Sequence, residues 1–209
     1  LVQLQEKTGV ALLYDASACG SIPVIRNLEE YYDNDLLVSI RGILNGSTNF
    51  ILSRMFIHSE SYSDALCQAQ SLGFAESNPD FDVMGFDALY KLIILALHSF
   101  GTFIQPEQAF CYGIQNLTNF DIGYAREKGK KIKLVAHLRK FSESCFTLFV
   151  IPTLVAPDDY IFNVENEFNG VVIEGQYYDK QFMFGKGAGG FPTASAVLSD
   201  ITARLHGYR

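Results

Sequence analysis

Cysteine pairs, long apolar runs and positive charge are all scarce in this sequence, and each scarcity excludes a class of protein. The 209 residues include four cysteines, none of them in a C-x-x-C pair, which indicates neither a structural zinc site nor a disulfide framework. No apolar run reaches the roughly 18 residues that a membrane-spanning helix needs, and no signal-peptide pattern begins the chain. We therefore expect reduced thiols, no membrane insertion and a cytoplasmic protein.

Positive charge is too sparse for general binding to nucleic acid. Lysine and arginine number 16 against 23 acidic residues, which gives a net charge of -7 and a pI near 5.0. A protein that binds nucleic acid without sequence preference needs a clustered basic face. The densest basic run, residues 128–133, fits a solvated turn before a strand better. We expect no nucleic-acid partner.

The sequence does contain a helical first half and a strand-rich second half, without repeats or linkers, which predicts one α+β domain with a mainly antiparallel sheet. A helix end over residues 1–8, stopped by Gly9 and followed by a strand, is typical of a chain cut from a longer α/β protein, so we expect a domain upstream. The predicted helices are residues 21–30 with Ser21 as N-cap, 50–56, 61–73, 83–100 ended by Gly101, and 193–205; the predicted strands are residues 10–14, 131–139, 145–151, 170–177 and 181–184.

An acidic stretch before the apolar helix carries the strongest chemical signal. Four acidic residues and one lysine fall within residues 76–91. Alternating polar residues from Asn78 onward match the start of a calcium-binding loop. The Gly and Glu that such a loop requires at its sixth and twelfth positions are replaced by Val83 and Leu89, which excludes an EF-hand.

Asp87 and Lys91 share a helix face because they are spaced i, i+4. One interpretation is an exposed ion pair, which contributes about 0.3 to 0.5 kcal/mol. The other is a catalytic or ligand-binding pair. The neighbouring positions are apolar almost all round the helix, so its polar stripe must face a cavity or a partner. His98 extends this stripe, and we expect it to be a hydrogen-bonded core histidine.

The glycine-rich stretch GKGAGGFPTASAV, residues 185–197, matches the dinucleotide-binding pattern G-x-G-x-x-G. That fingerprint opens a strand-helix-strand unit with an acidic residue about 20 positions further on. The sequence ends 19 residues after Gly190, which leaves no room for the second strand. We therefore interpret these glycines as a loop of another kind.

Several stretches closely resemble the catalytic part of homoserine dehydrogenase, in the same order and over nearly all of the chain: residues 14–25, 41–52 (RGILNGSTNFIL), 69–76 (AQSLGFAE), 78–91 (NPDFDVMGFDALYK) and 187–200. The resemblance implies helices packed on a mainly antiparallel or mixed sheet. It implies an enzyme that uses NAD or NADP to interconvert L-aspartate 4-semialdehyde and L-homoserine, on the route to threonine, isoleucine and methionine.

The same resemblance makes residues 1–209 the catalytic, substrate-binding and dimerisation domain of a homodimer, without the N-terminal Rossmann domain that holds most of the cofactor. It leaves open the choice between NAD and NADP and a fusion to an aspartate kinase. An alternative of a different class is a regulatory or ligand-binding module with a vestigial dehydrogenase site.

The resemblance also implies roles for individual residues. Lys91 would exchange the proton at the substrate oxygen, with Asp87 as its partner. The implied substrate-binding residues are Glu76, for the amino group, Asp82, Gly46 and Ser47; the implied cofactor-binding residues are Gly46 and Gly189; the implied ligands of a monovalent cation such as Na⁺ are the Asp15 carboxylate and the carbonyls of Ala18, Gly20 and Ile22. The sequence has Asp15, Phe74 and Asn78 where the family usually has Glu, Tyr and Asp.

Overall fold

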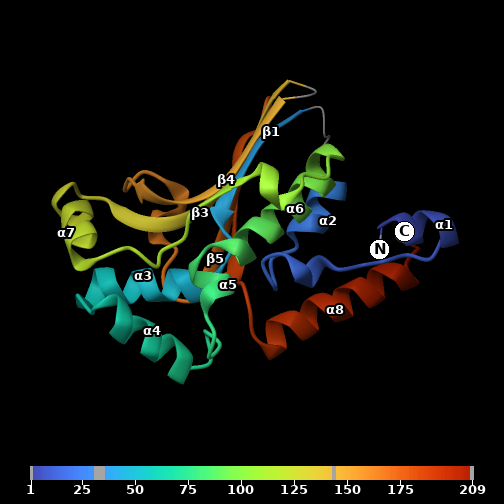
Figure 1. Ribbon diagram of the computed structural model, residues 1–209. Helices are drawn as coiled ribbons and strands as arrows, with labels where there is room; N and C mark the ends of the chain where they lie inside the picture. Colours follow the sequence, from blue (N-terminus) through green and yellow to red (C-terminus); the bar gives the residue numbers. More distant parts are fainter. Residues whose placement is uncertain (1, 31–35, 143–144, 208–209) are drawn as a thin grey trace.

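The computed structural model describes residues 2–30, 36–142 and 145–207, and this part of the chain is built on one mixed sheet (Figure 1). The strand order is β2-β4-β3-β1-β5-β6, so the first strand in the chain lies inside the sheet. Within the described residues the strands are β1 Leu37–Ile43, β2 Phe110–Cys111, β3 Lys131–Ser142, β4 Cys145–Val155, β5 Phe168–Gly175 and β6 Asp179–Lys186.

Antiparallel pairing dominates the sheet, as predicted. Strand β1 pairs antiparallel with β3 on one side and with β5 on the other, and Ile40 lies opposite both Leu138 and Ile173. The β3–β4 and β5–β6 pairs are also antiparallel, whereas the two-residue β2 pairs with β4 in parallel. The predicted α+β class is confirmed.

Strand β1 and the helix Asn119–Glu127 are not among the predicted elements. The sequence of β1, LVSIRGI, lacks an aromatic residue and carries glycine, serine and arginine. A register shift between Leu37 and Ser39 also breaks the alternation that marks a strand. Gly42 is required in β1 because a Cβ there would lie 2.4 Å from the carbonyl oxygen of Gly170 on β5.

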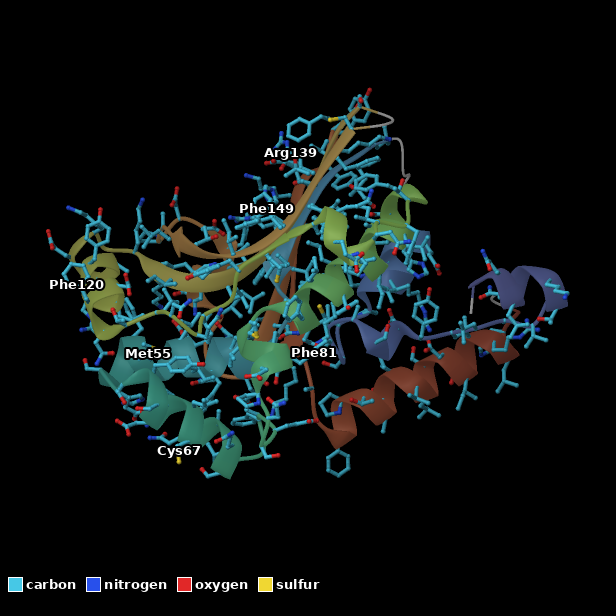
Figure 2. The ribbon with its side chains drawn as sticks, in the orientation of Figure 1. Met55, Cys67, Phe81, Phe120, Arg139 and Phe149 are labelled. Atoms are coloured by element: carbon cyan, nitrogen blue, oxygen red, sulfur yellow. The ribbon has the colours of Figure 1, made fainter. Side chains whose placement is uncertain are left out.

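Helices cover one face of the sheet, where α3 and α6 pack against β3 and its neighbours. Met55 of α3 is fully buried and points toward the sheet, whereas Cys67 of α4 is exposed (Figure 2). Helix α8 extends away from the sheet and lies beside the N-terminal segment (Figure 1). Within the described residues the helices are α1 Val2–Thr8, α2 Val24–Glu30, α3 Gly46–His58, α4 Tyr62–Ser71, α5 Asp80–Val83, α6 Phe86–Phe100, α7 Asn119–Glu127 and α8 Gly190–Leu205, with short 3-10 turns η1 Asp15–Ser17, η2 Pro106–Gln108 and η3 Tyr160–Asn163.

Several helix ends follow the predicted capping signals. The Ser61 hydroxyl accepts a hydrogen bond from the backbone N–H of Asp64 at 3.1 Å and begins α4. Gly101 ends α6 in the left-handed region, at a φ of 62°. The helix predicted over residues 83–100 is divided at Gly85, whose φ of 89° favours glycine, so α5 and α6 are separate.

Two predictions near the start of the chain are wrong. Residues 10–14 form no strand, and Ser21 does not cap α2. The Asp15 carboxylate takes that place, because its Oδ1 accepts hydrogen bonds from the backbone N–H groups of Ile25 at 3.1 Å and Arg26 at 3.2 Å. A cap supplied from ten residues away leaves no local pattern in the sequence. Residue 1 lies outside the described residues.

The main hydrophobic core lies between the sheet and the helices, and a smaller apolar cluster covers part of the other face of the sheet together with η3. The smaller cluster consists of Ile43, Val135, Val155, Ile161, Val164 and Val172. In the described part of the chain, no helix combines the length and the apolar character needed to cross a membrane.

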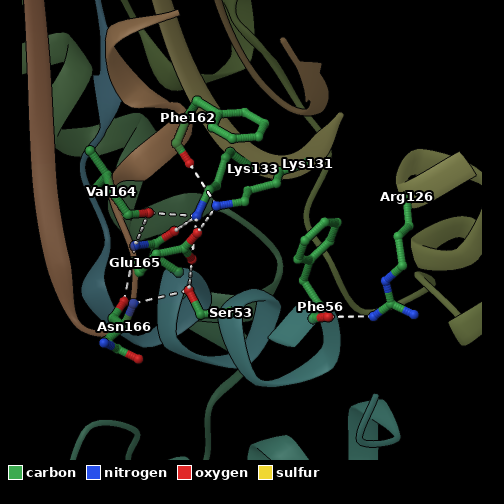
Figure 3. Close-up of polar contacts among 10 residues, drawn as sticks. Ser53, Phe56, Arg126, Lys131, Lys133, Phe162, Val164, Glu165 and Asn166 are labelled. Carbon is green, nitrogen blue, oxygen red and sulfur yellow. Dashed lines mark hydrogen bonds and ion pairs between the residues drawn. The ribbon is translucent and has the colours of Figure 1, made fainter. Parts of the chain in front are cut away.

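A buried lysine holds the turn before β5 against α3 (Figure 3). Lys133 on β3 is 1% exposed. Its ammonium donates to the Asn49 side-chain oxygen at 3.2 Å, to the Val164 carbonyl, and to the Glu165 carboxylate at 3.0 Å. All three of its N–H bonds are therefore satisfied, as a buried charge requires.

The Glu165 carboxylate lies at the centre of this network. It also pairs with Lys131 and accepts a hydrogen bond from the Ser53 hydroxyl at 2.7 Å. Burial acts to raise the pKa of Glu165, but the two lysines and Ser53 lower it overall. Burial lowers the pKa of Lys133 to about 8, against the attraction of Glu165, so both partners are charged at neutral pH.

We predict that Glu165→Gln lowers the free energy of unfolding by about 3 kcal/mol at pH 7, because it leaves the Lys133 charge buried without its counter-ion. A carboxylate whose pKa is lowered by folding stabilises the protein above its unfolded pKa and loses that effect as the pH falls. The deficit of the variant should therefore shrink below pH 4.5. Urea unfolding at a series of pH values measures this difference.

The exposed pair of Glu127 with Lys128 supplies the control, since Glu127→Gln removes a carboxylate from an ion pair at the surface and should change stability little at any pH. A Glu165→Gln protein as stable as the wild type at pH 7 would contradict the assigned role of the network.

Candidate active site

Most of the predicted site residues line one pocket of about 430 Å³ beside the end of β1. Gly46, Ser47, Asp82, Asp87, Lys91 and Gly189 are the predicted residues that meet there. The remaining lining residues are Asn45, Leu72, Gly73, Phe74, Glu167, Gly187 and Ala188.

The pocket forms where the ends of several elements converge. Helix α3 begins at Gly46 with Asn45 as its N-cap, and Leu44 alone separates Asn45 from the end of β1. Asp87 lies in the first turn of α6, and Lys91 follows one turn later on the same side. The segment from Gly187 to Gly189 joins β6 to α8. Residues far apart in the sequence are therefore fixed by regular elements rather than by one long loop.

Asp87 and Lys91 form an ion pair in the pocket wall. The Lys91 Nζ lies 2.7 Å from Asp87 Oδ2, and their side chains are 19% and 22% exposed. Lys91 also donates to the carbonyl oxygen of Leu44 at 3.1 Å. The pair therefore lines a cavity, as the second interpretation of its spacing requires, and is not a fully solvated surface pair.

Asn45 connects the two pocket carboxylates to α3. Its Nδ2 donates to Asp82 and to Asp87, both at 2.8 Å. Its Oδ1 accepts from the backbone N–H of Thr48 at 2.8 Å and so caps the helix. Asn45 is not among the predicted site residues, although an Asn before Gly-Ser-Thr is a recognisable N-cap.

The Asp82 carboxyl is held in an acidic environment. Burial raises its pKa, the hydrogen bond from Asn45 acts to lower it, and the neighbouring Asp87 raises it further. Proximity to Lys91 acts to lower it. The ionised form is therefore less favoured here than in water.

Backbone shapes much of the remaining wall. A Cβ at Gly46 would lie 2.5 Å from the carbonyl oxygen of Glu167, so only glycine allows this turn to pack on the start of α3. Gly189 has a φ of 120°, which favours glycine. The Ser47 hydroxyl donates to the carbonyl of Phe74. Glu167 was also missed, because a single acid between strands carries no pattern.

Glu76 and His98, which belong to the acidic stretch and to the polar stripe of the helix, do not line the pocket. Glu76 is exposed. The Gln70 Nε2 donates a hydrogen bond to the backbone carbonyl oxygen of Glu76 at 3.0 Å. His98 is hydrogen-bonded to the Tyr14 hydroxyl at 2.6 Å and to Glu29 at 2.5 Å. Its side chain is 13% exposed, which confirms the expected hydrogen-bonded histidine.

Two of the groups predicted to bind a cation make hydrogen bonds within the protein. One Asp15 oxygen is occupied by the N-terminus of α2, and the Ile22 carbonyl accepts from the backbone N–H of Val24 at 2.8 Å. Burial raises the pKa of Asp15, which disfavours its charged form. Among the described residues no group of three or more His, Cys, Asp or Glu side chains could hold a metal ion. The cation site with Ala18 and Gly20 stays a prediction.

The fold of this chain is shared with solved oxidoreductases of one kind. The homoserine dehydrogenase structure from Thiobacillus denitrificans matches 98% of this chain, with a TM-score of 0.92 and 39% identity, and this chain covers 48% of it. The structure of a hyperthermophilic archaeal homoserine dehydrogenase in complex with NADPH matches 97% of this chain, with a TM-score of 0.81 and 28% identity, and 58% of that chain is covered.

Sequence comparison agrees with the structural match. The model of the homoserine dehydrogenase family matches residues 23–202. Homoserine dehydrogenase from Helicobacter pylori is 40% identical over 90% of this chain and 44% of its own length, and the enzyme from Corynebacterium glutamicum is 37% identical over 100% and 49%. The chain belongs to the homoserine dehydrogenase family. It spans about half the length of the curated relatives that it matches.

We predict that Asp82→Asn raises the free energy of unfolding at pH 7 by about 1 kcal/mol, because site residues are placed at a cost in stability. An acid whose pKa is raised by folding destabilises the protein above its folded pKa, and this penalty disappears below its unfolded pKa. The gain should therefore shrink as the pH is lowered toward 3.8. Thermal unfolding of both proteins across this pH range tests it, and a variant less stable than the wild type at pH 7 would refute it.

Proposed function

We propose that this chain is the catalytic, substrate-binding and dimerisation domain of a homoserine dehydrogenase, and that the complete enzyme uses NAD or NADP to interconvert L-aspartate 4-semialdehyde and L-homoserine. The observation that carries the proposal is the Asp87–Lys91 pair lining a pocket in a chain of this family. In this role the enzyme would serve threonine, isoleucine and methionine synthesis in the cytoplasm. The intact pair also argues against a vestigial site.

Lys91 would exchange the proton at the substrate oxygen. When the aldehyde carbon gains a hydride, its oxygen becomes an alkoxide and needs a proton, which an ammonium can donate; in the reverse direction the neutral amine takes the proton from the hydroxyl. Asp87 and the Leu44 carbonyl accept hydrogen bonds from two of the three ammonium N–H groups. No other acceptor among the described residues is hydrogen-bonded to Nζ. The third N–H bond is thus available to the substrate.

The residues present fit a nicotinamide beside the substrate. Gly46, Gly187, Ala188 and Gly189 present backbone and a single methyl group to the pocket, so a flat ring can approach that wall. A bound nicotinamide would supply or accept the hydride. The relative solved with NADPH supports this cofactor class.

The carboxylates of the pocket would bind the amino group of the substrate. Asp82 and Glu167 line the pocket, Asp87 is paired with Lys91, and Glu167 lies 3.7 Å from the exposed Lys186 ammonium. Glu76 would add a further carboxylate, as the family resemblance implies. An acidic pocket favours a substrate that carries an ammonium group.

A second domain would pack against α8. A groove of about 740 Å³ lies between residues 9–17 and α8, and it is lined largely by apolar side chains. On the same helix Phe191 is 94% exposed and Leu205 is 82% exposed. Apolar exposure of this extent is typical of a surface that another domain covers. The relatives' greater length is consistent with a nucleotide-binding domain at this position.

We predict that Lys91→Ala lowers kcat for homoserine oxidation by about 100-fold to 10,000-fold in the complete enzyme, because it removes the general acid–base group. The protein should stay folded. Absorbance of the reduced cofactor at 340 nm measures the rate. Lys128→Ala, which changes a lysine at the surface, should have the wild-type rate, and a Lys91→Ala enzyme with nearly normal turnover would remove Lys91 from this role.

We predict that the face of the sheet opposite α3 and α6 forms the homodimer interface. Phe184 on β6 is 53% exposed and stacks on Phe168 of β5, with ring centroids 4.9 Å apart. Phe184→Glu would place a charge in the interface and should convert the dimer to a monomer in sedimentation velocity experiments. Phe120→Glu is the matched control, because Phe120 is 82% exposed on α7, away from this face (Figure 2). Equal dimer affinity of the two variants would exclude this face.

A further inference from the structure

Asn169, near the start of β5, has an unusual arrangement of hydrogen bonds for a buried side chain. It is 0% exposed, and its Nδ2 donates to the carbonyl oxygen of Leu44 at 3.1 Å. Its Oδ1 is buried and unpaired among the described residues, and the amide also interacts with the buried Cys19 thiol. An unpaired buried acceptor costs free energy, so such a group calls for an explanation other than stability.

The explanation lies at the carbonyl oxygen that Asn169 contacts. The Leu44 oxygen also accepts the hydrogen bond of Lys91, again at 3.1 Å. Leu44 directly follows β1 and precedes the Asn45 cap of α3. Two side chains from different elements, Asn169 on β5 and Lys91 on α6, therefore meet at one backbone oxygen beside the pocket.

Close packing fixes the Asn169 amide in place. A Cβ at Gly187 would lie 2.2 Å from Asn169 Cγ, so the amide fits only because residue 187 is glycine. Asn169 is not among the residues that line the pocket, whereas Gly187 is. The amide thus lies behind the pocket wall, between the glycine segment and the Leu44 carbonyl.

The turn that leads into β5 is itself held rigidly. The Asn49 Nδ2 of α3 lies 2.9 to 3.2 Å from the carbonyl oxygens of Val164, Asn166 and Phe168, which share its two N–H groups. Ser53 accepts a hydrogen bond from the backbone N–H of Asn166 at 2.9 Å, and the Lys133 network lies beside it (Figure 3). The strand that carries Asn169 therefore starts at a fixed distance from α3.

We propose that Asn169 is a positioning residue for Lys91, acting through the Leu44 carbonyl that the two side chains share. The proposal rests on the proposed function, in which Lys91 exchanges the substrate proton. Asn169 holds the carbonyl in a fixed direction, and the carbonyl in turn holds the ammonium toward the pocket. Asn169 touches neither pocket nor substrate, so its effect is on geometry alone.

A purely structural role makes the opposite prediction. Leucine has almost the shape of asparagine and carries no polar atom, so at a site chosen for stability it would avoid the unpaired Oδ1. If Asn169 serves only the fold, replacing it lowers stability and leaves the chemistry unchanged. If it positions Lys91, the replacement spares stability and slows the chemistry.

The test is Asn169→Leu in the complete enzyme, with homoserine as substrate. We expect a Tm equal to or above that of the wild type, a KM for homoserine within twofold, and a kcat roughly 10-fold to 100-fold lower, as for a displaced catalytic group. The solvent deuterium isotope effect on kcat should also increase, because proton transfer by a displaced Lys91 becomes the slower step.

The control is Val171→Ala, a fully buried residue on the same face of β5. It should lower the Tm and leave kcat and the isotope effect unchanged. In Asn169→Ser the side chain is too short to reach the Leu44 carbonyl, so kcat should fall as it does in Asn169→Leu. Wild-type kcat in Asn169→Leu, or failure of both Asn169 variants to fold, would overturn the positioning role. A wild-type enzyme that does not oxidise homoserine would instead refute the proposed function, and this inference with it.

Discussion

The hydrogen bonds at the end of strand β1 are the constraint on which the site depends. Asn45 caps α3 with one side-chain atom and holds Asp82 and Asp87 with the other. The preceding carbonyl, that of Leu44, accepts Lys91. Two consecutive residues thus join the central strand, α3, α5 and α6. Because a central strand is held on both sides by its neighbours, this point is well suited to carry charged groups that must not move.

Charge in the pocket is balanced at a cost. Three carboxylates line the pocket: Asp87 pairs with Lys91, Glu167 lies 3.7 Å from the Lys186 ammonium, and Asp82 forms no ion pair among the described residues. The raised pKa of Asp82 records this cost, since burial disfavours the ionised carboxylate and the neighbouring Asp87 repels it. A substrate ammonium would relieve the same repulsion. Under the proposed function, stability and substrate binding therefore make opposite demands on this carboxylate.

The sequence predicted the parts of this structure that are encoded locally. Ser61 and Gly101 end helices because capping acts within one turn, and Asp87 with Lys91 share a face because helical periodicity places them there. Strand β1 was missed because its pattern is set by strands more than 90 residues away. The capping of α2 by Asp15 was missed for the same reason, since a contact made through tertiary structure leaves no local signal.

The same distinction explains why the charged residues that line the pocket could be predicted from the sequence and their supports could not. A cluster of acids before an apolar helix is visible in the sequence. A backbone carbonyl such as that of Leu44 is not, because every residue type carries one. Gly46 and Gly187 matter because of what a Cβ would meet, at Glu167 and at Asn169 respectively. The precision of the site thus rests on contacts between backbone and buried amides. Substitutions at these supports change geometry without changing any charge in the pocket, so under the proposed function we expect their effects in kcat rather than in substrate affinity.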